Sequence, residues 1–224
     1  TLEVEDYKLT AKLLQRLKNS ATGILISGAP GSGKTTFASA LAKAYVKLNK
    51  IVKTIESPRD LQVPPEVVQY SKNLGNRDDI HNVMLLTRPD YTIFDEMRTT
   101  EDFRLYADLR LAGIGLAGVI HATNPIDSVQ RFIGRVELGM IPQIIDTVVF
   151  IRDGKVEHVF EMVMKVKVPT GMVEADLSRP VIEVRDFETQ ELDYEIYTYG
   201  EPPVVVAIKK RKSAQAERGG PVSF

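Results

Sequence analysis

The fold is decided by Gly28-Ala29-Pro30-Gly31-Ser32-Gly33-Lys34-Thr35 of this 224-residue chain. This stretch fits the spacing Gly-x-x-x-x-Gly-Lys-[Ser/Thr] of a loop whose backbone N–H groups surround phosphates. The apolar run at 23–27 predicts a buried strand before it, and residues 35–50 carry apolar side chains at helical spacing after it. Because a helix dipole adds to the exposed N–H groups, such a loop favours bound anions. The sequence therefore predicts a nucleotide-binding α/β protein.

Each part of this loop has an expected task. The glycines let the backbone approach the phosphates, Lys34 reaches the β and γ oxygens, and the Thr35 hydroxyl ligates Mg²⁺. The expected ligands are therefore ATP and Mg²⁺. The predicted nucleotide-binding residues are Gly28, Gly31, Ser32, Gly33, Lys34, Thr35 and Thr36.

Composition limits the remaining possibilities. With 43% hydrophobic residues the chain can bury a full core, and a formal net charge of -1 identifies no partner by itself. The absence of cysteine excludes disulfides and thiolate metal sites, which fits a reducing compartment, and we expect the cytoplasm. No apolar stretch approaches the ~18 residues of a membrane span, so no membrane insertion is expected, and the first residues do not resemble a signal peptide. Because the chain does not begin with Met, we expect it to be part of a longer protein.

Strand and helix patterns alternate as far as Asp146, which implies a mainly parallel sheet, and hairpin patterns follow. Prolines between 57 and 65 indicate an irregular excursion up to Asn76. The predicted strands cover 23–27, 51–55, 91–94, 117–121, 147–151, 156–164, 181–185 and 192–199, and the predicted helices cover 7–17, 35–50 and 78–87 or begin at 99 and 124. We expect a core at 1–165 with a short N-terminal helix, a β-rich appendage at 166–205 and a basic flexible tail at 206–224.

Polar residues stand at the carboxyl ends of three predicted strands, where ligands bind in open α/β sheets. Asp95 and Glu96 follow one strand and could hold Mg²⁺ together with Thr35, although a solvated acidic turn would have the same sequence. Glu56 follows another and could accept the proton of the attacking water, or could be a helix-capping acid. His121 ends a third and could sense the γ-phosphate, but a lone histidine there is more often structural.

Four stretches of the sequence resemble motifs of a known family and occur in the same order. Residues 55–58 (Ile-Glu-Ser-Pro) resemble the acidic box of the secretion and pilus-motor ATPases, and residues 88–98 resemble their Walker B segment. Residues 100–105 and 118–123 look like their following helix and histidine box. The likeness covers about residues 20–165 and is closest to the archaeal PINA type, in which a PIN domain precedes the ATPase and a KH-like module follows. It implies a RecA-like ATPase core, roles for Glu56 and His121, and a homohexamer with nucleotide between subunits.

The chain departs from the pilus pattern in ways that bear on catalysis. Asp95 stands where those motors carry Gly, so Glu96 competes with Glu56 for the role of base, and Glu56 is the weakly preferred one. Ser57 replaces a usual Asp. Too few residues precede the first strand for the N-terminal domain that supplies arginines in pilus motors. The arginines that could replace them are Arg59, Arg77, Arg88, Arg98 and Arg104, of which Arg88 and Arg98 are the preferred catalytic residues.

The favoured function is ATP hydrolysis by a ring that moves DNA, of the Holliday junction branch migration or helicase type. The basic run at residues 209–212 offers an electrostatic contact for DNA, or is a solvated tail. The alternative is a secretion or pilus-type ATPase that moves protein subunits. A P-loop kinase is a third hypothesis, but neither an acceptor pocket nor a lid is visible in the sequence.

Overall fold

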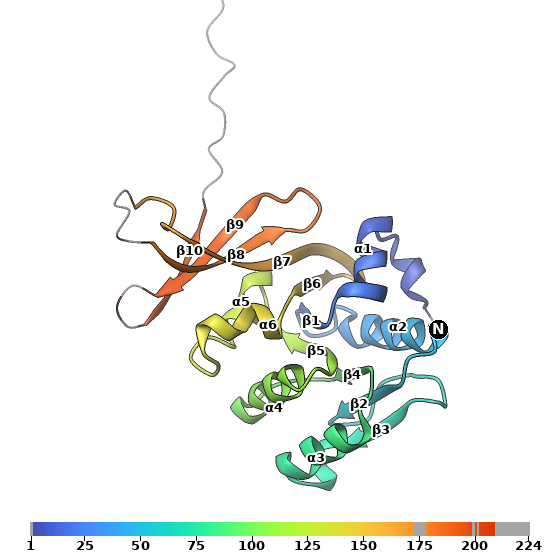
Figure 1. Cartoon of the computed structure of the whole chain (residues 1–224). Coiled ribbons are helices and arrows are strands. Elements are labelled where there is room, and N and C mark those ends of the chain that lie inside the picture. The colour runs from blue at the N-terminus through green and yellow to red at the C-terminus, as the bar shows by residue number, and fades with distance from the viewer. Residues whose placement is uncertain (1, 173–177, 199, 201, 209–224) are drawn as a thin grey trace, which may run out of the picture.

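A computed structural model of the chain describes residues 2–172, 178–198, 200 and 202–208. These residues form one ten-stranded sheet with helices on both faces (Figure 1). The basic run at 209–212, with the rest of the predicted tail beyond residue 208, lies outside the described residues.

The sheet has the strand order β10-β9-β8-β7-β6-β1-β5-β4-β2-β3. The half from β6 to β3 is parallel throughout, and the half from β6 to β10 is antiparallel. The fold is therefore α/β with a mixed, mostly parallel sheet, which agrees with the α/β class predicted from the sequence. The strands are β1 Gly23–Gly28, β2 Val52–Glu56, β3 Val68–Ser71, β4 Tyr91–Phe94, β5 Gly115–His121, β6 Thr147–Arg152, β7 Lys155–Lys167, β8 Arg179–Asp186, β9 Leu192–Thr198 and β10 Pro203–Ala207.

Helices cover the parallel half on both sides, and each side has its own apolar core. One core joins the sheet to α2 and the N-terminal turns, and the other joins it to α3, α4, α5 and α6. Because α2 and α4 are each preceded by a strand of the parallel half, their N-termini meet at the carboxyl edge of the sheet. The helical elements are η1 Val4–Tyr7, α1 Ala11–Gln15, η2 Arg16–Ser20, α2 Lys34–Lys47, η3 Lys72–Leu74, α3 Arg77–Thr87, α4 Thr100–Leu111, α5 Pro125–Gln130, η4 Leu138–Met140 and α6 Ile141–Ile144.

Local sequence accounts for the helix starts. Thr99 and Asp102 form a reciprocal capping box at α4, and Asn76 and Asp79 do so at α3. Pro125 occupies the first turn of α5, where its missing N–H costs nothing. These caps fix where the helices begin, and so they fix the loops that precede them.

Strand β3 was not predicted, because it lies within the excursion between Pro58 and Asn76. It pairs in parallel with β2, and its side chains are exposed or half-buried. An edge strand of this kind lacks the buried apolar run that marks the central strands. The excursion therefore returns to the sheet and adds its outermost strand.

The β-rich part continues the same sheet. Strand β7 runs through residue 165, the expected boundary between core and appendage, and β8, β9 and β10 follow it as antiparallel neighbours. Within this part Glu183 is 2% exposed and lies 3.1 Å from Lys165, 2.5 Å from Lys167 and 2.6 Å from Arg185. Burial alone would raise the pKa of Glu183, but the hydrogen bonds from these cations outweigh it and lower the pKa to about 2.

Replacement of Glu183 should therefore destabilise the sheet in a pH-dependent way. Because its pKa falls on folding, the ion cluster contributes stability above about pH 4.5, and that contribution is lost as the pH falls towards 2. We expect Glu183→Gln to lower the free energy of unfolding at pH 7 by about 3 kcal/mol. Urea unfolding from pH 7 to pH 3 measures this. Glu157→Gln, which removes a surface pair with Arg152 at 2.8 Å, is the control and should cost less than about 1 kcal/mol. Equal losses of unfolding free energy for the two variants would contradict the stabilising role assigned to the Glu183 ion cluster.

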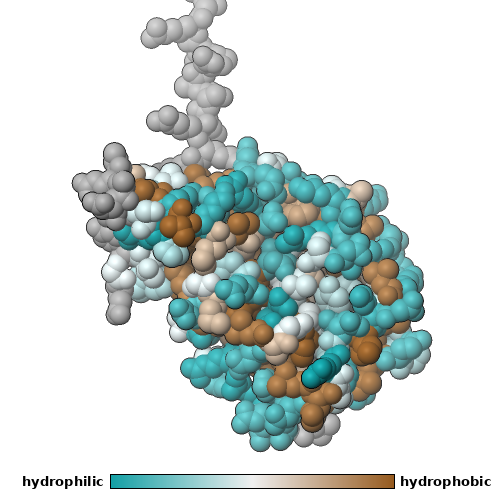
Figure 2. Space-filling view, viewed as in Figure 1, coloured by the Kyte–Doolittle hydropathy of each residue, from teal (hydrophilic) through white to brown (hydrophobic). Residues whose placement is uncertain are grey.

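The surface of the described residues is mixed in character. Figure 2 shows small hydrophobic groups among hydrophilic residues on one face. Within the described part of the chain, no helix is long and apolar enough to cross a membrane. The exposed large hydrophobic side chains come from many different elements and are Leu2, Leu48, Ile51, Val68, Leu86, Leu111, Val166 and Val204.

Candidate functional site: a phosphate loop with three carboxylates

The glycine loop lies between β1 and α2, as its sequence predicts. Gly33 is the N-cap of α2 and has a left-handed φ of 97°, which only glycine adopts readily. A side chain at Gly28 would meet the Ile151 carbonyl oxygen at 2.3 Å, so the backbone of β6 lies directly against the loop. The N–H of Gly154, in the turn between β6 and β7, donates to the Ser32 carbonyl at 2.9 Å. The hairpin that follows the parallel half therefore supports the loop from behind.

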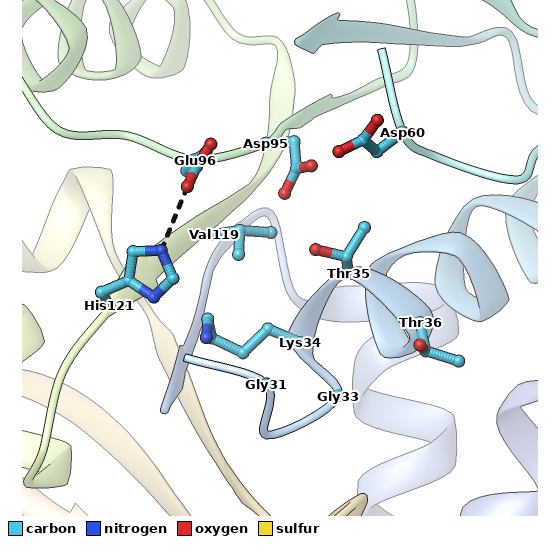
Figure 3. A pocket seen from close by; sticks show the side chains of 10 residues that line it. All are labelled: Gly31, Gly33, Lys34, Thr35, Thr36, Asp60, Asp95, Glu96, Val119 and His121. Atoms are coloured by element: carbon cyan, nitrogen blue, oxygen red, sulfur yellow. Dashed lines mark hydrogen bonds and ion pairs between the residues drawn. The ribbon is translucent and has the colours of Figure 1, made fainter. Parts of the chain in front are cut away.

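Lys34 and Thr35 open helix α2 and reach the same cavity of about 290 Å³ (Figure 3). Lys34 is 4% exposed, and its Nζ donates to the Ala29 carbonyl at 2.7 Å. Burial lowers the pKa of Lys34, while Asp95 and Glu96 act to raise it. A buried ammonium beside carboxylates and at a helix N-terminus is the arrangement that holds phosphate oxygens.

Two aspartates face this loop. Asp95, at the carboxyl end of β4, is 6% exposed, and its Oδ1 has no hydrogen-bond partner among the described residues. Burial and the neighbouring Glu56, Glu96 and Asp60 carboxylates raise the pKa of Asp95 to about 6. Asp60 also lines the cavity, from the loop after β2 (Figure 3). So much uncompensated negative charge beside one lysine indicates a site that requires a cation.

The residues present fit Mg²⁺. Within the described ranges, no group of three or more His, Cys, Asp or Glu forms a ready metal cage. Mg²⁺ needs no such cage, since it binds through one or two carboxylates together with substrate phosphates and water. The Thr35 hydroxyl and the unpartnered Asp95 Oδ1 supply the oxygen donors. Side-chain atoms of Ser27, Ser32 and His121, in or beside the loop, are also buried without a hydrogen-bond partner in the part of the chain that the structure describes, as expected of a site built for a polar ligand.

Glu96 connects the acidic side of the cavity to His121. Its carboxylate lies 3.1 Å from His121 Nε2 (Figure 3). It also accepts a hydrogen bond from Arg98. The bond from Arg98 and the bond from His121 lower the pKa of Glu96. Its backbone has a left-handed φ of 59°, which costs a residue other than glycine about 1 kcal/mol or more. Such strain at a charged residue in a cavity is typical of a functional position.

Glu56 lies behind the cavity rather than in its described lining. It is fully buried and accepts hydrogen bonds from Thr54, from the Leu61 N–H at 3.0 Å and from Gln69 at 3.0 Å. The bond to Leu61 fixes the loop that carries Asp60. Its predicted role as the base remains a prediction, and its visible contacts are those of a residue that shapes the loop.

The two preferred arginines lie in different places. Arg98 follows β4, is exposed, and pairs with Glu96. Arg88 is the C-cap of α3 and precedes β4, so it lies at the amino end of the strand, away from the cavity. A role for Arg88 across a subunit boundary stays a prediction.

The structure thus brings most of the predicted residues together and adds two, Asp60 and Val119. The described lining of the cavity is Gly31, Gly33, Lys34, Thr35, Thr36, Asp60, Asp95, Glu96, Val119 and His121. Asp60 was missed because it lies beyond residues 55–58, the stretch interpreted as the acidic box. The signal was present, since Asp60 is the next acid after the strand that ends at Glu56.

Comparison with known proteins agrees with this geometry. Residues 2–156 match the family model described as type II/IV secretion system protein. The chain is 56% identical over 216 residues to the Holliday junction branch migration ATPase PINA of Sulfolobus acidocaldarius, covering 96% of this chain and 42% of that protein. It is 58% identical over 213 residues to an uncharacterized KH and PIN-domain containing protein of Methanocaldococcus jannaschii, covering 95% and 33%. The chain therefore spans less than half the length of either curated relative.

Solved structures agree on the fold. The pilus retraction motor PilT with bound ADP superposes with a TM-score of 0.53 at 18% identity, over 83% of this chain and 53% of that one. The predicted resemblance to the secretion and PINA-type ATPases is confirmed, and with it the enzyme class, an ATPase. The chain belongs to the family of type II/IV secretion system proteins.

Proposed function

We propose that the chain is the motor core of a ring that hydrolyses ATP with Mg²⁺ and moves DNA. The observation that carries the hydrolytic part is the single cavity in which Lys34, Thr35, Asp95 and Glu96 meet at the carboxyl edge of the sheet. The loop amides and Lys34 bind the β and γ phosphates, and Thr35 with Asp95 would hold Mg²⁺, which neutralises phosphate charge when bound. A second hollow of about 400 Å³ shares Thr35, Thr36 and Asp60 with the first and offers space for the nucleoside.

Glu96 is the group that we assign to activate the attacking water. Its carboxylate lines the cavity, and its pKa, lowered by the hydrogen bonds from Arg98 and His121, keeps it in the ionised form that a general base requires. His121, 3.1 Å away, orients this carboxylate. Glu56 has no comparable access, because its oxygens are engaged with Thr54, Leu61 and Gln69.

The cavity is short of positive charge for phosphoryl transfer. Lys34 is the one cationic side chain in its described lining, against Asp60, Asp95 and Glu96. A transition state with charge spread over three oxygens is stabilised by additional cations, often an arginine from a neighbouring subunit. This supports a homohexamer with nucleotide at the subunit boundary, with Arg88 and the exposed Arg59 as the arginines to test.

The names of two relatives favour DNA as the cargo. PINA of Sulfolobus acidocaldarius, 56% identical, is named for Holliday junction branch migration, and the Methanocaldococcus jannaschii relative is named for KH and PIN domains. A chain of net charge -1 can still line a ring with basic loops, since six copies present each loop six times. On this proposal PIN and KH-like domains flank the motor core in the whole protein, which works in the cytoplasm.

ATP turnover of the natural full-length protein tests this cargo. We expect a four-way DNA junction to raise turnover above the rate without DNA, and duplex DNA to raise it less. Binding should weaken with salt by a log-log slope of about -0.9 for each phosphate contacted. The same assay with Lys34→Ala measures the background. If neither the junction nor duplex DNA changed the rate of ATP turnover at low salt, that result would contradict the proposal of a DNA motor.

A protein-moving ATPase is the second candidate, and the family match over residues 2–156 favours it. This alternative predicts that turnover responds to a membrane-anchored protein partner instead of DNA. The two outcomes are separable, because both require the same ATP site and differ only in what stimulates it.

A further inference from the structure

Glu96 needs support from outside the cavity, since its left-handed backbone is unfavourable for a residue with a side chain. Part of that support is nearby. The Met97 N–H donates to the Val119 carbonyl at 2.9 Å, and Met97 is buried. Beyond it, the N–H groups of Arg98 and Thr99 donate to Asp102 Oδ2 at 2.8 and 3.0 Å. The segment after β4 is therefore tied down on its C-terminal side by Met97 and Asp102.

Lys72 supplies the support at Glu96 itself. Its Nζ lies 3.3 Å from the Glu96 carbonyl oxygen and 3.2 Å from each carboxylate oxygen of Asp102. These three acceptors match the three N–H donors of an ammonium group. The side chains of Lys72 and Asp102 are 18% and 10% exposed, and the ammonium lies 5.4 Å from the centre of the Phe94 ring. Partial burial makes this ion pair stronger than one on the open surface.

The position of Lys72 in the fold separates this role from catalysis. Lys72 begins η3, directly after the edge strand β3, and lies outside the described lining of the cavity. Its side chain therefore reaches the Glu96 segment from the outer edge strand of the sheet and does not line the cavity proposed to bind the phosphates. Among the described strands β3 pairs only with β2, so this contact also connects the outer strand to the loop after β4.

We propose that Lys72 is a positioning residue for ATP hydrolysis, which holds the turn at Glu96 so that the carboxylate faces the cavity. The proposal rests on the proposed hydrolysis and on Glu96 as the group that activates water. Lys72→Met keeps an unbranched side chain of nearly the same length and removes the charge and its donors. We expect it to lower kcat for ATP by about 10- to 100-fold with KM changed less than about threefold, because the phosphate loop is untouched. Lys72→Arg should recover most of the loss.

The control is Lys53→Met, which removes a buried lysine from the neighbouring strand β2. Lys53 Nζ lies 3.4 Å from the Tyr70 hydroxyl and 5.3 Å from the centre of that ring, so its surroundings are similar but do not include Glu96. Its kcat should stay within about threefold of the wild type. Thermal unfolding of all variants shows whether a loss of activity accompanies a loss of structure.

A double-mutant cycle distinguishes positioning from a general structural effect. In the Glu96→Gln background, Lys72→Met should cost little further in kcat, because the carboxylate that it positions is already absent. An equal fold-loss in both backgrounds, or wild-type kcat for Lys72→Met, would overturn the proposal. If the wild-type protein itself turned over no ATP, the proposed function would fail instead, so the two failures are distinct.

Discussion

Lys34→Ala is expected to reduce ATP turnover by at least about 10²- to 10³-fold, to the background of the assay. Lys34 is the one cationic side chain in the described lining of the cavity, and it faces Asp60, Asp95 and Glu96. Its loss removes a charge-assisted hydrogen bond to the phosphates and leaves the negative charge without local compensation. Steady-state phosphate release at saturating ATP and Mg²⁺ measures this.

The fold should survive this change, because the loop geometry depends on its glycines and on backbone bonds to the β6–β7 hairpin. Lys47→Ala is the matched control, since it lies on the same helix, is exposed, and pairs with Glu3 at 2.9 Å. It should keep full turnover. Wild-type turnover in Lys34→Ala would remove the assignment of the phosphate loop.

Glu96→Gln should slow ATP turnover by about 10²- to 10⁴-fold while Mg-ATP binding persists, which is the expected effect of removing a general base. Glutamine keeps the size of the side chain and can still accept a hydrogen bond from Arg98. The phosphate loop, Thr35 and Asp95 are unchanged. Binding of a fluorescent ATP analogue, measured beside single-turnover hydrolysis, separates the two effects.

Glu56→Gln is the comparison that decides between the two carboxylates. A glutamine at this position can still accept the hydrogen bond from the Leu61 N–H, which holds the loop of Asp60. We therefore expect a loss of less than about tenfold, the scale of one weakened hydrogen bond. A larger loss for Glu56→Gln than for Glu96→Gln would return the role of base to Glu56.

Much of the fold could be predicted from the sequence, since its central strands are buried on both faces and read as apolar runs. Strand β1 and helix α2 follow from the glycine spacing and the periodicity around it. Strand β3 could not be predicted in this way, because Val68–Ser71 is a half-exposed edge whose place is set by pairing with β2. A short edge strand has little of the hydrophobic pattern by which a strand is predicted from sequence.

The site was partly predictable for a similar reason. Asp95 and His121 lie at strand ends, and Lys34 and Thr35 open the helix that follows β1, so a parallel sheet brings all four to one edge. The burial of Glu56 and the approach of Asp60 depend on an irregular loop held by hydrogen bonds at Leu61 and Gln62, which no periodicity encodes. The contact of Lys72 with the Glu96 carbonyl joins positions 24 residues apart through tertiary packing, and sequence spacing is silent about it.

Movement of strands on a four-way DNA junction by the natural full-length protein tests the central claim most directly, because it couples the ATP site to the proposed cargo. A junction with one labelled arm is incubated with Mg²⁺ and ATP, and the products are separated by native electrophoresis. The account predicts that the wild-type protein converts the junction to duplex products only with ATP, and that Lys34→Ala leaves it intact. A wild-type protein that hydrolyses ATP at full rate yet leaves the junction unchanged would contradict the account.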